Sequence, residues 1–226
     1  MPLLQLIIIN FITGPIIMIF YDCLTAPSPR RTRILLHEKN VPHEVVNVDL
    51  MSGEQLAPDF KTINPSCTVP ALKLDDGTVL TETAGIAAYL ESAFPNPPML
   101  GSTDIEKGLV ANWNARIEFE GLYAIAEALR NSSPMMKGRA ITGENNYEQI
   151  PELAKRGMER VNVFFETLNQ RLKGRDFVAI DTFSNADISA VIAVDFAQVI
   201  KLSPQPHHEN IIRWRQSLAS RPSLLI

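Results

Sequence analysis

Glu82 and Thr83 stand directly before a stretch with helical periodicity, where they could bind a small anion. The first backbone N–H groups of a helix have no partner inside the helix, so they favour a negatively charged group. The Thr83 hydroxyl could add a donor, and Glu82 could face an ammonium group. The same residues also fit a plain helix start, with a threonine cap and an acidic residue near the positive end of the helix dipole. Both interpretations stay open on these residues alone.

A proline interrupts the apolar stretch TVPAL, residues 68–72. Proline donates no backbone hydrogen bond, so Pro70 weakens a central strand. A cis Val69–Pro70 bond would explain its presence, because this rare geometry is kept where backbone groups are presented outward. An ordinary trans proline at the edge of a strand is the alternative.

The cysteines and histidines show no metal-binding spacing. Cys23 and Cys67 are far apart and form no CxxC motif, and His207 and His208 lie before the last predicted helix without a partner at metal-ligand spacing. We therefore expect no metal site. Two free cysteines fit a reduced, cytoplasmic compartment better than a secreted one, although two cysteines can also pair.

The composition is that of an ordinary globular protein. The chain has 226 residues, of which 46% are hydrophobic, and a formal net charge of −4. This length is enough for one large domain or two small ones. The densest basic cluster is only Arg30, Arg31 and Arg33, so nucleic acid is not an expected partner.

The first twenty residues are almost wholly apolar and carry no charge. Such a segment is long enough to span a bilayer, so a membrane anchor is one interpretation. However, Gly14-Pro15 interrupts it, and it lacks the positive region and cleavage site of a secretory signal. We favour an apolar extension over residues 1–15, a buried strand from Ile16 to Tyr21, and no membrane association. Met18 would then be a natural start of the chain.

The pattern up to about residue 94 alternates between strands and helices. It predicts strands at 16–21, 43–48, 71–74 and 79–81, and helical segments at 29–39, 54–61 and 84–93. Strand–helix–strand followed by a hairpin and a helix is a small α/β unit, which we place at residues 16–94.

The remaining chain has helical periodicity throughout. A proline-rich linker at residues 95–103 leads into a helical region at residues 104–226. Pro151 fits the first turn of a helix that stops near Gly174. Ser184-Asn185-Ala186-Asp187 resembles a capping box with Asp in place of the usual Glu. The fold class is thus an α/β unit followed by an all-α unit.

Taken together, the α/β unit, "TVPAL", "LTET" and the "SNAD" helix start resemble the cytosolic glutathione transferase family, in order and spacing, over residues 16–223. The resemblance implies a thioredoxin-like N-terminal domain that binds glutathione as a co-substrate. It also implies an all-helical C-terminal domain that helps to form the pocket of a hydrophobic electrophile. A cytoplasmic, homodimeric detoxification enzyme is the expected form.

The resemblance also implies roles for individual residues in glutathione binding. The backbone of Val69, before Pro70, would pair with the cysteinyl part of glutathione as an added strand would. Glu82 and Thr83 would hold the γ-glutamyl end. Gln55 falls where relatives carry a residue that reaches the glycyl carboxylate, although a solvated glutamine explains it as well.

The catalytic segment departs from the family pattern. The family holds glutathione as its thiolate, using a hydroxyl donor and the N-terminus of the following helix. When "RTRILL" is aligned on relatives with R-x-R, the usual Ser or Cys position falls on Ala26, which can donate nothing. We propose Ser28 first, Thr25 second and Tyr21 third as the donor. Ser28 would also serve as a helix cap, and Cys23 fits a buried structural thiol.

Two alternatives to conjugation of an electrophile stay open. The R-x-R relatives make a glutathione-dependent isomerase or dehalogenase plausible. Ala26 instead favours a catalytically silent module that binds glutathione or another protein.

Overall fold

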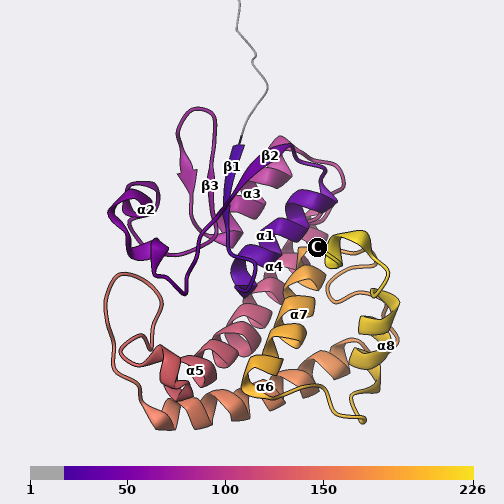
Figure 1. The fold of residues 1–226 in the computed structure, drawn as a ribbon. Coiled ribbons are helices and arrows are strands. Elements are labelled where there is room, and N and C mark those ends of the chain that lie inside the picture. The colour runs from indigo at the N-terminus through magenta and orange to yellow at the C-terminus, as the bar shows by residue number, and fades with distance from the viewer. Residues whose placement is uncertain (1–17) are drawn as a thin grey trace, which may run out of the picture.

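The structure is a computed structural model that describes residues 18–226. The apolar extension at residues 1–15 and the start of the first strand at Ile16 lie outside the described residues. Within them, the chain forms an N-terminal domain with a mixed four-stranded sheet and a helical C-terminal domain (Figure 1). This confirms the fold class predicted from the sequence.

The sheet has the strand order β2-β1-β3-β4. Its strands are β1 (Met18–Asp22), β2 (His43–Asn47), β3 (Ala71–Lys73) and β4 (Val79–Leu80). β1 pairs in parallel with β2, and β3 runs antiparallel to both β1 and β4. β1 alternates fully buried and half-buried residues, as expected for a strand whose two faces differ in burial.

Three helices accompany the sheet: α1 (Pro27–Glu38), α2 (Pro58–Ile63) and α3 (Thr83–Ala93). α1 packs against α3, and Figure 1 shows α2 on the other side of the strands. A short 3-10 turn, Glu54–Leu56, precedes α2. Each element lies within a few residues of its predicted position, and the largest shifts are at the helix starts.

The expected cap at Ser28 was wrong, and the alternative interpretation of Thr83 as a helix cap is wrong as well. α1 begins at Pro27, so its N-cap is Ala26, and Ser28 lies inside the first turn. α3 begins at Thr83, so its N-cap is Glu82. Neither N-cap side chain accepts a hydrogen bond from its helix. Both helix starts therefore keep backbone donors available in the first turn.

The C-terminal domain contains long helices and short connecting turns. The helices are α4 (Asp104–Arg116), α5 (Tyr123–Ser132), α6 (Pro151–Arg171), α7 (Asn185–Phe196) and α8 (Glu209–Ser217). A π-helical turn, Ile117–Leu122, joins α4 to α5. The 3-10 turns are Pro134–Met136, Ala197–Ile200 and Pro222–Leu224. The predicted capping box at Ser184 and Asp187 is confirmed.

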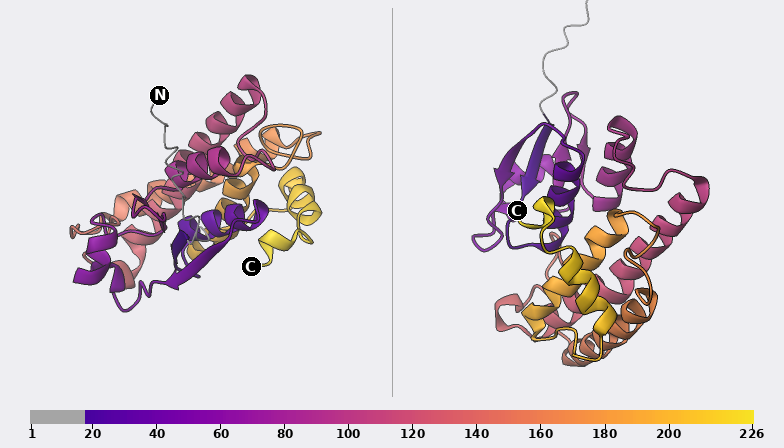
Figure 2. Two further views of the ribbon diagram at one scale, coloured as in Figure 1. Left: turned by 90° about the horizontal axis from the view of Figure 1, so that it is seen from above. Right: turned by 90° about the vertical axis from the view of Figure 1, so that its right-hand side faces the viewer.

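α7 is the centre of the helical domain. Every residue from Ala186 to Val194 is buried, so the helix is buried on all sides rather than on one face. α7 packs against α1, which joins the cores of the two domains. Figure 2 shows the C-terminal segment lying alongside α1, in agreement with the contacts of the last 3-10 turn.

Among residues 18–226, no helix is both long enough and apolar enough to cross a membrane.

Candidate functional site

Three of the predicted site segments lie at the same end of the sheet, where β1 stops and β3 starts, and we call this end the sheet edge. Tyr21 pairs with Ala71 in an antiparallel ladder, so the end of β1 lies beside the start of β3 and hence beside Pro70. Leu80 pairs with Leu72, so the segment that follows β4 leads back to the same edge. The turn after β1, the Val69–Pro70 step and the start of α3 therefore share one edge.

The Val69–Pro70 peptide bond is cis, as predicted from the sequence. Val69 is half-buried and Pro70 is buried. Within the described residues, neither the N–H nor the C=O of Val69 forms a hydrogen bond. The Val69 backbone thus offers one donor and one acceptor at the sheet edge, as pairing with an extended ligand requires.

The start of α3 offers donors to an anion. Thr83 is its first residue and is half-buried, whereas Glu82 is exposed. Ile86 donates its N–H to the carbonyl of Glu82, which leaves the amides of the preceding turn free. This geometry fits a carboxylate at the helix N-terminus, with Glu82 beside it to face a cation.

The turn after β1 is held by Asp22, a residue that no sequence motif singles out. Its carboxylate is buried, accepts the N–H of Cys23 at 2.7 Å and binds the Arg33 guanidinium through both oxygens. Arg33 lies on α1, so this pair ties the turn to the helix that follows. The R-x-R motif draws attention to Arg33, but it does not identify Asp22 as the partner of this arginine.

The start of α1 has few free donors. Pro27 and Pro29 occupy its first and third positions, and proline has no N–H. Arg30 donates its amide to the carbonyl of Ala26, and Ala26 donates to Cys23. The Ser28 amide is therefore the free donor of the first turn, and its half-buried side chain adds a hydroxyl.

The other two predicted hydroxyl donors have different surroundings. The Thr25 side chain is exposed, and its Oγ1 lies 3.5 Å from the Sγ of Cys23. Tyr21 is half-buried, and its ring packs edge-on against Phe60 of α2, 5.9 Å between centroids. Cys23 and Cys67 are both buried and free, as expected from the sequence.

Gln55 lies in the 3-10 turn before α2 and is half-buried. Its Oε1 is buried and has no hydrogen-bond partner among the described residues. A buried carbonyl oxygen without a partner is costly, so this atom would suit a hydrogen-bond donor of a ligand.

A cleft of about 610 Å³ adjoins the turn after β1. Thr25 and Ala26 form one wall of it, and α7 with the C-terminal residues forms the other. Most of its lining is apolar and comprises Leu24, Pro27, Ile192, Phe196, Val199, Leu224, Leu225 and Ile226. The cleft can accept an apolar molecule next to the start of α1.

Both guanidinium groups of the cleft contact carboxylates. Arg30 binds Asp195 at 3.1 Å, and Arg33 binds Asp22. Asp195 is itself shared with Arg215, so three guanidinium groups meet two carboxylates and one positive charge remains without its own counter-charge.

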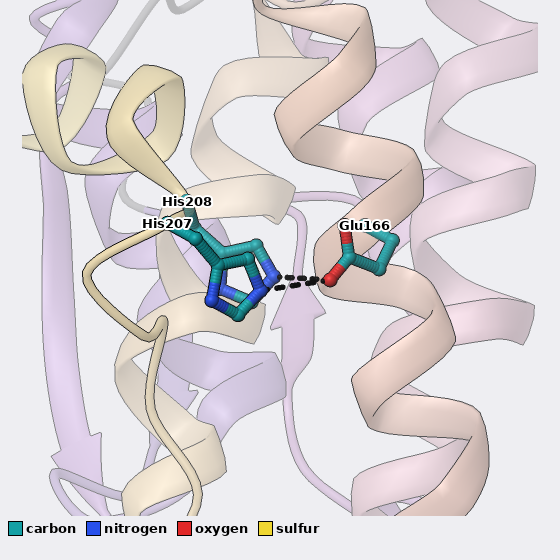
Figure 3. Close-up of side chains that lie close together, drawn as sticks. All are labelled: Glu166, His207 and His208. Atoms are coloured by element: carbon teal, nitrogen blue, oxygen red, sulfur yellow. Dashed lines mark hydrogen bonds and ion pairs between the residues drawn. The ribbon is translucent and has the colours of Figure 1, made fainter.

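A second cluster lies far along the chain, on α6 and before α8 (Figure 3). Glu166, His207 and His208 bring three possible metal ligands within 4.8 Å of one another, so the expectation that the histidine pair has no partner at metal spacing was wrong. Both histidines place Nε2 at about 3 Å from Oε1 of Glu166.

The protonation of His208 argues for a hydrogen-bonded cluster. The Gln205 N–H donates to Nδ1 of His208, so in the neutral ring Nε2 carries the proton and donates it to Glu166. A metal ion would need that nitrogen unprotonated. The hydrogen bonds from His207 and His208 instead hold the pKa of Glu166 below its usual value and attach the start of α8 to α6.

Comparison with known families matches both domains. Residues 25–93 match the glutathione S-transferase N-terminal domain, and residues 131–222 match the glutathione S-transferase C-terminal domain. The chain is 34% identical over 211 residues to glutathione S-transferase 2 of Saccharomyces cerevisiae, covering 92% of this chain and 88% of that protein. It is 29% identical to maleylacetoacetate isomerase of Mus musculus over 192 residues, covering 83% and 82%.

Solved structures agree with these matches. A glutathione S-transferase domain-containing protein of Marinobacter aquaeolei superposes with a TM-score of 0.83 at 32% identity, covering 91% of this chain and 99% of that one. Ure2p in complex with glutathione superposes with a TM-score of 0.77 at 18% identity, covering 92% and 95%, which shows the shared fold.

Proposed function

Because this chain belongs to the glutathione S-transferase family, we propose that it binds glutathione at the sheet edge, stabilises its thiolate and conjugates it to an apolar electrophile. The Val69 backbone pairs with the cysteinyl part, and the start of α3 with Glu82 and Thr83 holds the γ-glutamyl end. The side-chain amide nitrogen of Gln55 donates to the glycyl carboxylate, because the carbonyl oxygen of that side chain can only accept.

One observation carries the proposal. The free backbone groups of Val69 and the uncapped starts of α1 and α3 lie on the same edge of the sheet. An extended peptide with carboxylates can pair with Val69 and place one carboxylate at α3, and its thiol then falls near the turn that leads into α1. A free thiol has a pKa of about 8.5, so donors at this turn are needed to keep it ionised at neutral pH.

Stabilisation of the thiolate is shared between a side chain and the backbone. Ala26 supplies no side-chain donor, so the Ser28 hydroxyl and amide act together, with Thr25 as a secondary donor. Tyr21 is the third candidate, and its packing against Phe60 makes it the least available of the three.

The acceptor binds in the cleft beside Thr25 and Ala26. Its apolar lining suits a hydrophobic electrophile. The relative named maleylacetoacetate isomerase points to the second candidate, a glutathione-dependent isomerase. The mostly apolar lining of the cleft favours conjugation over that reaction.

The test combines binding, ionisation and turnover. Calorimetric titration measures glutathione affinity, and the thiolate absorbance of bound glutathione against pH measures its thiol pKa. A panel of apolar and anionic electrophiles, together with cis–trans isomerisation of an unsaturated diacid, identifies the reaction. Binding without any lowering of the thiol pKa would instead favour a catalytically silent binding module.

The assembly and location are proposals as well. We propose a cytoplasmic homodimer, as family membership suggests. Sedimentation and cell fractionation of the full chain test these two points.

A further inference from the structure

α1 is held on the helical domain by two neighbouring arginines that reach different elements. Arg30 binds Asp195 of α7, and Arg31 binds Glu118 of the π-helical turn. The side chain of Arg31 is 10% exposed, against 25% for Arg30. The Arg31 guanidinium is therefore the better shielded of the two, whereas its partner Glu118 is more exposed than Asp195.

Arg31 depends on Glu118 for its neutralisation. Glu118 accepts from Nη1 of Arg31, while Nε of Arg31 is buried without a partner among the described residues. A buried guanidinium with one carboxylate has no nearby substitute when that carboxylate is removed. The position of Glu118 therefore fixes the position of Arg31, and with it the second turn of α1.

The π-helical turn is what presents Glu118. The Tyr123 amide donates to the carbonyl of Glu118, which is the wider, five-residue spacing of a π turn. Arg160 of α6 donates to the carbonyl of Phe119, and its guanidinium lies 4.7 Å from the centre of the Phe119 ring. The turn is thus also supported by a contact from α6.

We propose that Glu118 is a positioning residue, which acts through Arg31 to aim the start of α1 at the thiol of bound glutathione. The inference rests on the proposed function, because it presumes a thiol at the start of α1. It adds a residue of the helical domain to the machinery of the sheet edge, 87 positions from the arginine that it holds.

The geometry makes stabilisation of the thiolate sensitive to small movements of α1. Two prolines leave the first turn of α1 with one free backbone amide among the described residues, that of Ser28, so the backbone part of the stabilisation depends on the direction of a single N–H group. Hydrogen bonds weaken sharply when the donor angle departs from linear, so a small rotation of α1 removes much of the stabilisation.

The experiment measures the thiol pKa of bound glutathione in Glu118→Gln, at saturating glutathione and well below the unfolding midpoint. We expect that pKa to rise by about 0.5–1 unit, which lowers kcat/KM three- to tenfold at pH 6.5 and leaves it near wild type at high pH. Removal of a negative charge by itself would favour the thiolate and lower this pKa. The sign of the shift therefore separates positioning from a direct charge effect.

Glu120→Gln is the matched control. It removes the same charge from the same turn, but Glu120 pairs with the partly exposed Arg116 and, within residues 18–226, has no hydrogen bond or ion pair to α1. The thiol pKa of glutathione bound to Glu120→Gln should equal that of glutathione bound to wild type. If Glu118→Gln fails to fold, Arg31→Lys tests the same ion pair from α1 without a change of charge. This variant should also raise the thiol pKa of bound glutathione.

The outcomes distinguish a failure of the Glu118 proposal from a failure of the proposed function. If wild type lowers the thiol pKa and both Glu118→Gln and Arg31→Lys retain that value, Glu118 is not a positioning residue and the proposed function stands. If Glu120→Gln shifts the pKa as much as Glu118→Gln does, the inference is also wrong. If wild type itself leaves the thiol pKa at its free value, the proposed function fails first.

Discussion

The carboxylate of Asp22 accepts two hydrogen bonds from the Arg33 guanidinium, at 2.7 Å from Nε and 2.8 Å from Nη2. Such a bidentate pair fixes both the distance and the plane of the two groups. Because Asp22 ends β1 and Arg33 lies on α1, the pair holds the turn between them, which carries Thr25 and Ala26. The candidate thiolate site therefore depends on a buried charge pair outside it.

Loss of this pair should destabilise the fold. Asp22→Asn leaves the mostly buried Arg33 without its counter-charge, so the free energy of unfolding should fall by about 3 kcal/mol or more. Urea unfolding at neutral pH measures it. Asp75→Asn, at an exposed hairpin turn, should change stability by about 0.5 kcal/mol or less. Equal stabilities of the two variants would show that the pair contributes nothing net.

Thr83→Ala should weaken glutathione binding. The hydroxyl is proposed to donate to the γ-glutamyl carboxylate, and loss of a hydrogen bond to a charged group costs about 1–3 kcal/mol, or roughly five- to 150-fold in Kd. Thr83→Ser keeps the hydroxyl and should bind nearly as wild type. Calorimetric titration measures both, and an unchanged Kd for Thr83→Ala would remove Thr83 from the site.

Ser28→Ala should slow turnover at neutral pH by more than tenfold, with partial recovery as the pH is raised. A hydrogen bond to the charged sulfur is worth about 1.5–3 kcal/mol, so its loss raises the thiol pKa of bound glutathione by roughly one to two units. Since the Ser28 amide remains in the variant, the loss is partial. The pH–rate profile measures it.

Thr25→Ala is the comparison for Ser28, and its effect should be smaller. The Thr25 hydroxyl is exposed and lies against Cys23 in the structure. A wild-type rate and thiol pKa in Ser28→Ala, with a large loss in Thr25→Ala, would exchange the two roles.

Cys23→Ser/Cys67→Ser should keep most of the activity, because both thiols are buried and free and neither is needed to ionise glutathione. The assay is turnover at saturating glutathione, with circular dichroism to confirm the fold. A hundredfold loss with the fold intact would indicate a thiol-exchange enzyme instead.

Short sequence patterns predicted the segments at the sheet edge, but they did not predict the interactions that hold these segments in place. The strands and helices follow from periodicity, and the Val69–Pro70 and Glu82–Thr83 steps from short motifs, because each of these is encoded within a few residues. The start of α1 was misplaced because Pro27 and Pro29 both suit a first helical turn, and the later one was chosen.

Partners distant in the chain leave no such pattern. Arg31 and Glu118 are 87 positions apart, and the Glu166 partner of His207 is 41 positions away. Lys39 was expected only at the end of a helix, yet its ammonium is buried against the carbonyls of Phe94 and Pro97 and the carboxylate of Glu91. Such contacts arise only when two elements pack, so they required the structure.

Asp187 provides the pH-dependent prediction. Its side chain is fully buried and accepts hydrogen bonds from the amides of Val178 and Ser184, the Ser184 hydroxyl and Nε1 of Trp214. Burial raises the pKa of Asp187 to about 6, and these hydrogen bonds oppose the rise only in part. The folded protein therefore binds a proton here more readily than the unfolded chain, whose aspartate has a pKa near 3.8.

The sign of the stability effect follows from that difference. A raised pKa in the folded state adds stability that is complete below pH 4 and is lost as the pH rises through 6, with a total of about 3 kcal/mol. Asp187→Asn has the same shape but cannot titrate, so the wild-type-minus-variant difference in unfolding free energy isolates this site from other carboxylates. That difference should become more favourable to wild type by about 2 kcal/mol between pH 7.5 and pH 4.5. Urea unfolding of both proteins at the two pH values measures it. A constant difference would mean that the hydrogen bonds to Asp187 fully offset its burial, and a difference that shrinks on acidification would mean that they more than offset it.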